Sequence, residues 1–240
     1  MPTSIPTITF VPTITFVETM RGQVVMSQFT GAEKYRVALA DPGAENAALI
    51  DASLAEGEER DLVLPMIWQD LTIAVENRPG ANGEGLTGVI SAGHIQVGGL
   101  AEEPLQIRRG EFCLLPATPT GERRMRYRLE CLALDGRSYL LYGFKRIARA
   151  SGRLLPLAIW QDTTTLYVTI YELSAHHAPK ALVATGVIQI HLYDFLQQLF
   201  TLRSLYVAGP WGALCNIGRF GCFFAKGVLA AYGEGPLRVQ

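Results

Sequence analysis

Four side chains in the sequence could transfer protons, and they occupy matching places in two stretches of the chain. Asp70 and Asp162 each end an Ile-Trp-Gln-Asp tetrapeptide, while His94 and His191 each follow a Thr-Gly-Val-Ile segment. A carboxylate and an imidazole that meet in a pocket can act as acid and base. If the two stretches converge, these four residues are candidate catalytic groups of a cofactor-independent isomerase, hydratase or hydrolase acting on a lipid.

The structural interpretation of the same residues is favoured. Aspartate often accepts hydrogen bonds from backbone N–H groups in turns, and a lone histidine on a strand is more often structural than catalytic. The four cysteines have no C-x-x-C spacing, and no P-loop, nucleophile elbow or zinc-protease motif occurs. We therefore expect no metal site and no cofactor, and a non-enzymatic role is favoured over an enzymatic one.

The repeated segments predict an internal duplication. The two tryptophans of the tetrapeptide are 92 positions apart (160 − 68), and the Thr-Gly-Val-Ile segments are 98 apart (185 − 87). Their common order indicates two related halves. We expect a leader and first strand over residues 1–18, a first β repeat over 19–116, a second over 117–192 and C-terminal helices over 193–240, all within one structural unit.

Alternating apolar and polar residues predict a mainly antiparallel β protein. The pattern indicates strands over residues 12–17 (with β character continuing over 18–29), 34–40, 71–76, 86–97, 106–115, 125–134, 139–147, 160–172 and 182–191, while 41–61 could be a short helix or a mobile connection. Strands without intervening helices form a sandwich or a barrel, and a lipocalin-like barrel can enclose a ligand. Whether the two halves make one barrel or two stays open.

The C-terminal part of the chain changes to helical periodicity. Residues 192–202 have apolar side chains at helical spacing, and residues 211–232 form a long apolar run with Arg219 and Lys226 as its charges. We expect the second helix to lie against the β core, with Cys215 and Cys222 in packing positions. A membrane-surface helix is the lesser alternative, and we expect no transmembrane segment.

Bulk composition narrows the classes of partner. The chain has 240 residues, a hydrophobic fraction of 49% and a formal net charge of −1. Such a chain can bury a sizeable core, but its charge does not suit nucleic-acid binding, which requires a basic surface. The absence of a signal-peptide pattern at the first residues predicts a cytoplasmic protein.

A binding cavity between the strands would use aromatic side chains and a few polar groups. We expect Trp68, Trp160, Tyr142 and Tyr167 to lie near such a cavity. Lys145 stands in a β run, and if it points inward it needs an acidic partner, for which the sequence offers Glu18 or Glu130.

Several segments resemble one family. The chain is similar to the C-terminal β-rich region of bacterial cholesterol oxidase-like proteins of the glucose-methanol-choline oxidoreductase family. The similar segments are residues 16–22, 142–145, 160–167, 186–203, 219–221 and 223–224. The resemblance implies an accessory region that accompanies a flavin domain, which this chain lacks, so no oxidase activity is expected. It also implies lipid or steroid metabolism as the setting.

Three functions follow as expectations. The leading one is a non-catalytic module that binds a hydrophobic ligand, a steroid or another lipid. The enzyme described above is the second. The third is a docking domain that holds a separate oxidoreductase subunit or forms a homodimer through the apolar C-terminal helix.

Overall fold

The computed structural model describes residues 11–28, 33–41, 43–78, 85–118, 122–148 and 155–233. Of the predicted leader and first strand over residues 1–18, residues 1–10 lie outside the described residues. Nine strands and five helices occur among the described residues. In chain order they are β1 (Thr13–Met26), α1 (Glu33–Ala38), α2 (Ala47–Glu59), β2 (Val63–Glu76), β3 (Leu86–Val97), β4 (Gln106–Ala117), β5 (Arg123–Leu132), β6 (Ser138–Ile147), α3 (Leu155–Thr164), β7 (Thr165–Leu173), β8 (Pro179–Gln189), α4 (Leu192–Thr201), β9 (Arg203–Leu205) and α5 (Gly209–Gly233).

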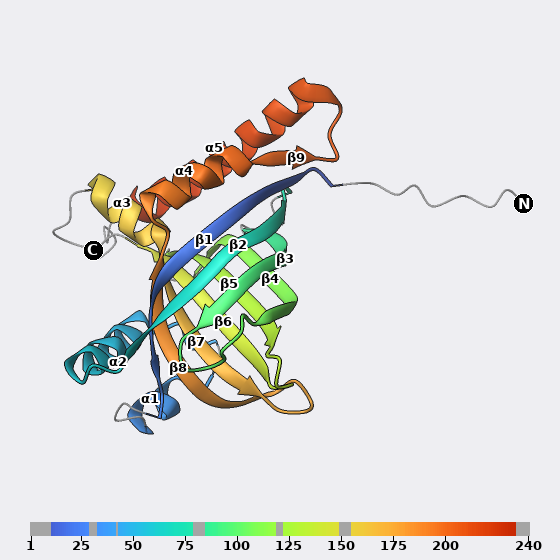
Figure 1. The fold of residues 1–240 in the computed structure, drawn as a ribbon. Helices are drawn as coiled ribbons and strands as arrows, with labels where there is room; N and C mark the ends of the chain where they lie inside the picture. Colours follow the sequence, from blue (N-terminus) through green and yellow to red (C-terminus); the bar gives the residue numbers. More distant parts are fainter. Residues whose placement is uncertain are drawn as a thin grey trace, which may run out of the picture.

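Eight antiparallel strands close into a single barrel, which confirms the prediction of a β barrel with C-terminal helices (Figure 1). Consecutive strands from β2 to β8 pair with one another, and β1 pairs with both β2 and β8. The two predicted halves therefore form one barrel, to which each supplies four strands. Alternation explains the result, because each strand can point one set of side chains inward and the other outward.

The barrel is not fully hydrogen-bonded along β1. This strand pairs with β8 over residues 21–26 and with the short β9 over residues 13–15. Between those two stretches, α4 lies against the edge of β1, where the N–H of Val17 donates to Thr201 Oγ1 at 2.9 Å. We call this interval of β1, residues 16–20, the seam. A helix, rather than a strand, covers the seam.

The barrel has an apolar interior and a second, smaller cluster on its outer wall. The interior contains Trp68, Tyr127 and many aliphatic side chains. The outer cluster forms where α2 and Leu39, the residue after α1, pack on β6, β7 and β8, and it includes Ile50 and Tyr171. Tyr171 donates a hydrogen bond of 2.7 Å to the carbonyl of Leu39, which fixes the end of α1 to the wall.

Two strand predictions were wrong. Residues 34–38 lie in α1, and Tyr35 and Leu39, the residue just after the helix, are both buried four positions apart. Residues 160–164 belong to α3, so β7 begins at Thr165 rather than at Trp160. Thr164 donates from Oγ1 to the carbonyl of Trp160 at 2.7 Å, which satisfies a carbonyl of the last helical turn. The ambiguous segment 41–61 contains α2, whose first turn is capped by the Asn46 side chain, which accepts from the N–H of Leu49.

The two copies of the tetrapeptide differ in structure. Residues 67–70 lie in strand β2, whereas residues 159–162 lie in helix α3. The Thr-Gly-Val-Ile segments do share a conformation, since they lie in β3 and β8. The expectation that the tetrapeptides mark equivalent positions of a structural repeat was therefore wrong.

Helix α5 forms as expected but is more exposed than expected. Ile217, Phe220 and Phe224 pack against the barrel core, yet Cys215 and Cys222 are exposed. The prediction that these two cysteines serve packing was wrong. By length and composition, α5 is the one helix of the described residues that could cross a membrane, and little of its apolar window is buried.

Candidate functional site

The main candidate site is a cavity of about 430 Å³ at the end of the barrel that α3, α4 and α5 cover. Strands β1, β4, β5 and β6 form its wall, and the three helices form its lid. Its volume falls within the range of small-molecule sites, about 300–1,000 Å³. The lining residues are Phe16, Glu18, Phe112, Leu114, Met125, Tyr127, Lys145, Pro156, Ile159, Trp160, Thr163, Thr164, Ile190, Phe195, Gln198, Leu199, Leu202, Ile217, Phe220, Gly221 and Phe224.

Aromatic rings line both the barrel side and the lid side of this cavity. Phe16 of β1 meets Phe112 of β4 edge-on with 6.3 Å between ring centroids, and it lies 6.4 Å from the ring of Phe220 on α5. On the lid, Trp160 of α3 meets Phe195 of α4 edge-on at 5.2 Å. These contacts connect the helices to one another and to the strands, and they leave an apolar surface for a ligand.

A buried ion pair interrupts the apolar wall. Lys145 Nζ lies 2.8 Å from Glu18 Oε1, and their side chains are only 1% and 3% exposed. Tyr127 donates its hydroxyl to the other carboxylate oxygen of Glu18 at 2.9 Å. The Lys145 ammonium also lies 5.3 Å from the Tyr127 ring centroid, within the range of a cation–π contact. The expectation that an inward Lys145 needs an acidic partner is confirmed, and the partner is Glu18.

The ion pair gives the cavity a neutral polar spot. Burial, followed by the nearby Glu18 carboxylate, raises the pKa of Tyr127 well above its usual value, so its hydroxyl stays protonated and donates. The charges of Lys145 and Glu18 cancel. An ammonium has three N–H donors, and within the described part of the chain Lys145 uses one of them, toward Glu18. The remaining donors can bind an oxygen of a ligand in the cavity.

The lid supplies a complementary acceptor. Gln198 of α4 lines the cavity, and its buried Oε1 has no hydrogen-bond partner among the described residues. A buried acceptor without a partner costs free energy unless a ligand or a water supplies a donor. The barrel wall of the cavity therefore offers donors, and the lid contains a buried acceptor without a partner among the described residues.

The two tryptophans expected near the cavity have different positions. Trp160 lines it directly. Trp68 is fully buried within the barrel, where its ring meets Tyr127 edge-on at 6.2 Å, and it is not among the lining residues. Trp68 thus supports a residue of the wall rather than facing the cavity.

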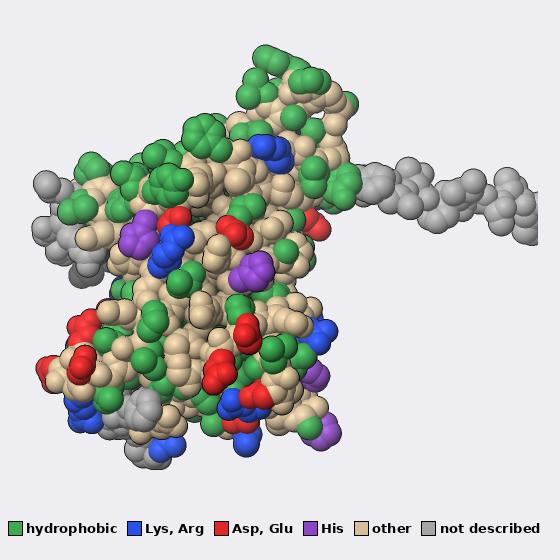
Figure 2. Space-filling view, viewed as in Figure 1, with side chains coloured by type: hydrophobic (Ala, Val, Ile, Leu, Met, Phe, Trp, Pro, Cys, Tyr) green, Lys and Arg blue, Asp and Glu red, His purple; other side chains and the backbone are tan. Residues whose placement is uncertain are grey.

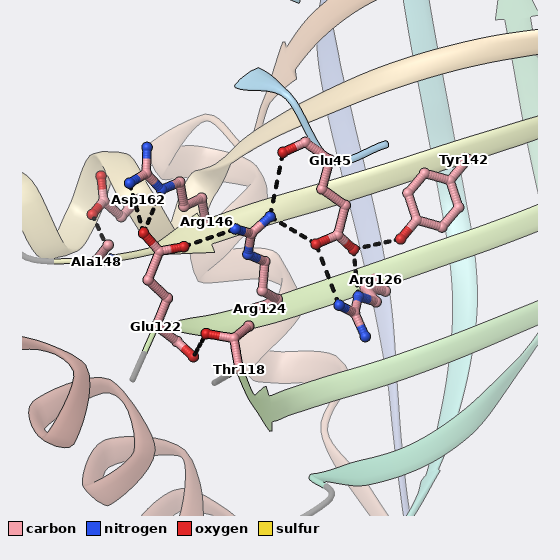
Figure 3. Close-up of polar contacts among 9 residues, drawn as sticks. All are labelled: Glu45, Thr118, Glu122, Arg124, Arg126, Tyr142, Arg146, Ala148 and Asp162. Carbon is pink, nitrogen blue, oxygen red and sulfur yellow. Dashed lines mark hydrogen bonds and ion pairs between the residues drawn. The ribbon is translucent and has the colours of Figure 1, made fainter. Parts of the chain in front are cut away.

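The structure corrects the expected positions of Tyr142 and Tyr167, which both lie outside the barrel. The hydroxyl of Tyr142 donates to Glu45, in the loop before α2 (Figure 3). The ring of Tyr167 stacks on Phe144 at 5.5 Å and lines an outer groove beside α2. In-and-out alternation explains this: Lys145 points into the barrel, so its neighbour on β6, Phe144, packs in the outer cluster.

A charged network on this outer wall was not predicted. Glu45 accepts from Arg124, Arg126 and Tyr142, and Arg124 also bonds to Glu122 at 2.7 Å (Figure 3). The network fixes the loop that leads into α2 to β5 and β6. The alternating arginines of β5 were a signal in the sequence, since charges at every second strand position share one face.

Glu122 is the second carboxylate of this network. It accepts from Arg124 and, at 2.6 Å, from Arg146. Burial by itself would raise the pKa of Glu122, but the hydrogen bonds from Arg146 and Arg124 outweigh it and lower the pKa below its usual value. The carboxylate is therefore ionised throughout the neutral range.

The four predicted acid–base residues do not converge. Asp70 is exposed in a bulge of β2 with a φ of 53°, and its N–H donates to Thr19 Oγ1. His94 on β3 is exposed, and so is His191, the residue before α4. Asp162 lies on α3 beside the outer groove and accepts from the hydroxyl of Tyr232 at 2.7 Å. The structure brings no carboxylate–histidine pair of this set into the barrel cavity.

Sequence reasoning missed most of the lid. Phe195, Gln198 and Leu199 were within a predicted helix, but no pattern showed that this helix lies along the edge of β1. The described residues contain no group of three or more His, Cys, Asp or Glu side chains arranged to hold a metal ion.

No family model, curated protein or solved structure matches this chain. The resemblance to the accessory region of cholesterol oxidase-like proteins therefore stays a prediction.

Proposed function

We propose that this protein binds a hydrophobic small molecule in the cavity between the barrel wall and α3, α4 and α5. The observation that carries the proposal is an apolar cavity of about 430 Å³ whose wall contains the buried Lys145–Glu18 pair. An apolar pocket with a few convergent polar groups is the usual form of a small-molecule site.

The charge balance of the wall favours a neutral lipid over a fatty acid. A ligand carboxylate beside Lys145 would add a second negative charge to a buried pair that is already neutral, and an extra buried charge is costly. A hydroxyl or carbonyl oxygen can accept from the ammonium without that cost. The preferred ligands are therefore molecules with an apolar body and one hydroxyl or carbonyl group, such as sterols, steroid ketones and fatty alcohols.

Mass spectrometry of an organic extract from the purified protein tests the proposal first. We expect a lipid at one equivalent per chain, or, for lipid-free protein, saturable binding of a fluorescent sterol. Binding should change the fluorescence of Trp160, which lines the cavity, and this change should be absent in the Trp160→Phe variant. An empty protein that binds neither sterols nor fatty alcohols would refute the proposal.

Two matched substitutions on α5 locate the ligand. Ile217 lines the cavity, whereas Leu214, three residues earlier, is 59% exposed. Ile217→Trp should fill part of the cavity and weaken binding by roughly tenfold or more, while Leu214→Trp should leave it unchanged. Equal affinities for the two variants would place the ligand elsewhere.

The polar spot can be tested without leaving a lone buried charge. The double variant Glu18→Gln with Lys145→Met removes both charges together, because either single change would strand the other charge. We expect the double variant to retain the fold and to lose most of its preference for a sterol over the matching hydrocarbon. A preference that persists would show that the ion pair does not hold the head group.

A further inference from the structure

We propose that the exposed face of α4, β9 and α5 docks on a membrane surface that contains anionic lipids. This face, residues 192–233 apart from the side chains that pack on the barrel, is called the helical surface below. Figure 2 shows hydrophobic side chains gathered over these elements, at the top of the molecule. The proposal does not depend on what the cavity binds.

The helical surface carries most of the large exposed apolar side chains of the described chain. Ten of the fifteen lie in α4, β9, α5 or the turn between them. Several are aromatic, including Tyr193, Phe200 and Trp211, which are 70%, 79% and 75% exposed. Monomeric soluble proteins rarely expose a contiguous patch of this kind, and tryptophan and tyrosine favour the boundary between lipid and water.

The charges of the same surface have one sign. Among residues 192–233 the charged side chains are Asp194, Arg203, Arg219 and Lys226, and Asp194 is buried and paired with Arg21, so the exposed charges are all positive. Arg219 and Lys226 are exposed on the side of α5 that carries Trp211 and Leu229. A face that combines apolar side chains with cations complements a bilayer with anionic headgroups. If a second copy of this chain covered the same face, the cations of the two copies would repel one another. This favours the membrane as the occupant.

The packing of α5 indicates that it lies on the membrane rather than crossing it. Phe220, Phe224 and Val228 pack against the barrel core at helical spacing. Asn216 is buried, and it both accepts from Asn77 and donates to Ser204 at 2.8 Å. Withdrawal of α5 into a bilayer would break these contacts and uncover the cavity.

The helical surface adjoins the lining of the cavity. Leu199 of α4 lines the cavity and is also 47% exposed. Both α4 and α5 line the cavity, so docking of both helices would bring the cavity lining close to the lipid. A ligand could then pass from the bilayer to the cavity with little exposure to water.

Vesicle co-sedimentation of the full chain tests this inference. We expect binding to vesicles of equal parts phosphatidylcholine and phosphatidylserine, and much weaker binding to pure phosphatidylcholine. Leu214→Glu with Leu229→Glu should reduce binding by roughly tenfold or more, because both side chains lie on the proposed contact face. The control is Leu134→Glu, since Leu134 is 72% exposed in the turn between β5 and β6, away from the helices.

Three results would overturn the inference. One is the absence of binding to either kind of vesicle, and another is equal loss of binding in the Leu134→Glu control. The third is a concentration-independent dimer on gel filtration that Leu214→Glu converts to a monomer, which would show that a second copy covers the face. The Ile217→Trp variant should lose ligand binding but still bind vesicles. A failure of ligand binding can therefore be distinguished from a failure of membrane docking.

Discussion

The two Ile-Trp-Gln-Asp segments have one sequence and two structures. Trp68 lies in strand β2 with its ring fully buried inside the barrel, whereas Trp160 lies in helix α3 at the edge of the cavity. Four identical residues therefore do not determine their own conformation, because packing overrides local propensity.

Strand pairing accounts for the difference better than the flanking residues do. After the first tetrapeptide the chain continues with Leu71 and then alternates through Ile73 and Val75, each of which is buried in the barrel. Proline does not separate the two copies, because Pro65 lies in β2 whereas Pro156 lies in the first turn of α3. Residues 66–68 pair with both β1 and β3, whereas the pairing of β7 with β8 begins only at Thr165, so the second tetrapeptide has no neighbouring strand to pair with.

Replacement of each tryptophan by alanine should give the largest difference between the two regions. Trp68→Ala removes a fully buried ring and should lower the free energy of unfolding by about 3–5 kcal/mol. Trp160→Ala, at a partly exposed position, should cost about 1 kcal/mol but should weaken ligand binding. Urea unfolding of both variants provides the measurement. Equal losses of stability would mean that the lid is as tightly packed as the barrel.

The contributions of the two tetrapeptide aspartates to stability should differ less than those of the two tryptophans. Asp162→Ala removes an acceptor from the Tyr232 hydroxyl, which joins α3 to the end of α5, and should cost about 1 kcal/mol. Asp70→Gly should change stability by less than about 0.5 kcal/mol, since glycine suits the positive φ at this exposed bulge. Thermal unfolding of the two variants would show which loses more stability. A larger loss for Asp70→Gly would contradict the prediction.

A further, pH-dependent effect concerns the charged network on the wall beside α3. The pKa of Glu122 is lowered in the folded state, so its contribution to stability is present above the unfolded pKa of about 4.5 and is lost as pH falls through the folded pKa. Glu122→Gln should therefore lower stability at neutral pH by less than about 1 kcal/mol, as expected for ion pairs near the surface. Denaturation at neutral and acidic pH should show the difference shrink on acidification. A constant difference would mean that the carboxylate's charge does not stabilise the fold.

The wall of the site could be predicted from the sequence better than its lid. The sequence left the direction of Lys145 open, but it required a carboxylate for a buried lysine, and Glu18, one of its two candidates, supplies it. The position of α4 could not be predicted, because it depends on how far β1 and β8 pair, and that is a property of the closed barrel. The wrong strand predictions at α1 and α3 have a related cause: over six to ten residues, alternation and helical spacing overlap, and contacts with distant elements decide between them.

The seam in β1 has a consequence during synthesis. All eight barrel strands emerge before α4, so until Thr201 reaches Val17 the growing chain presents part of a β edge that no strand covers. Exposed edges pair readily with other chains and lead to aggregation. A chain that ends at Ile190 should therefore associate through this edge, which analytical ultracentrifugation would detect, and a monomeric product would contradict it. The helix that covers the cavity would then also act as an intramolecular protector of the barrel against misassembly.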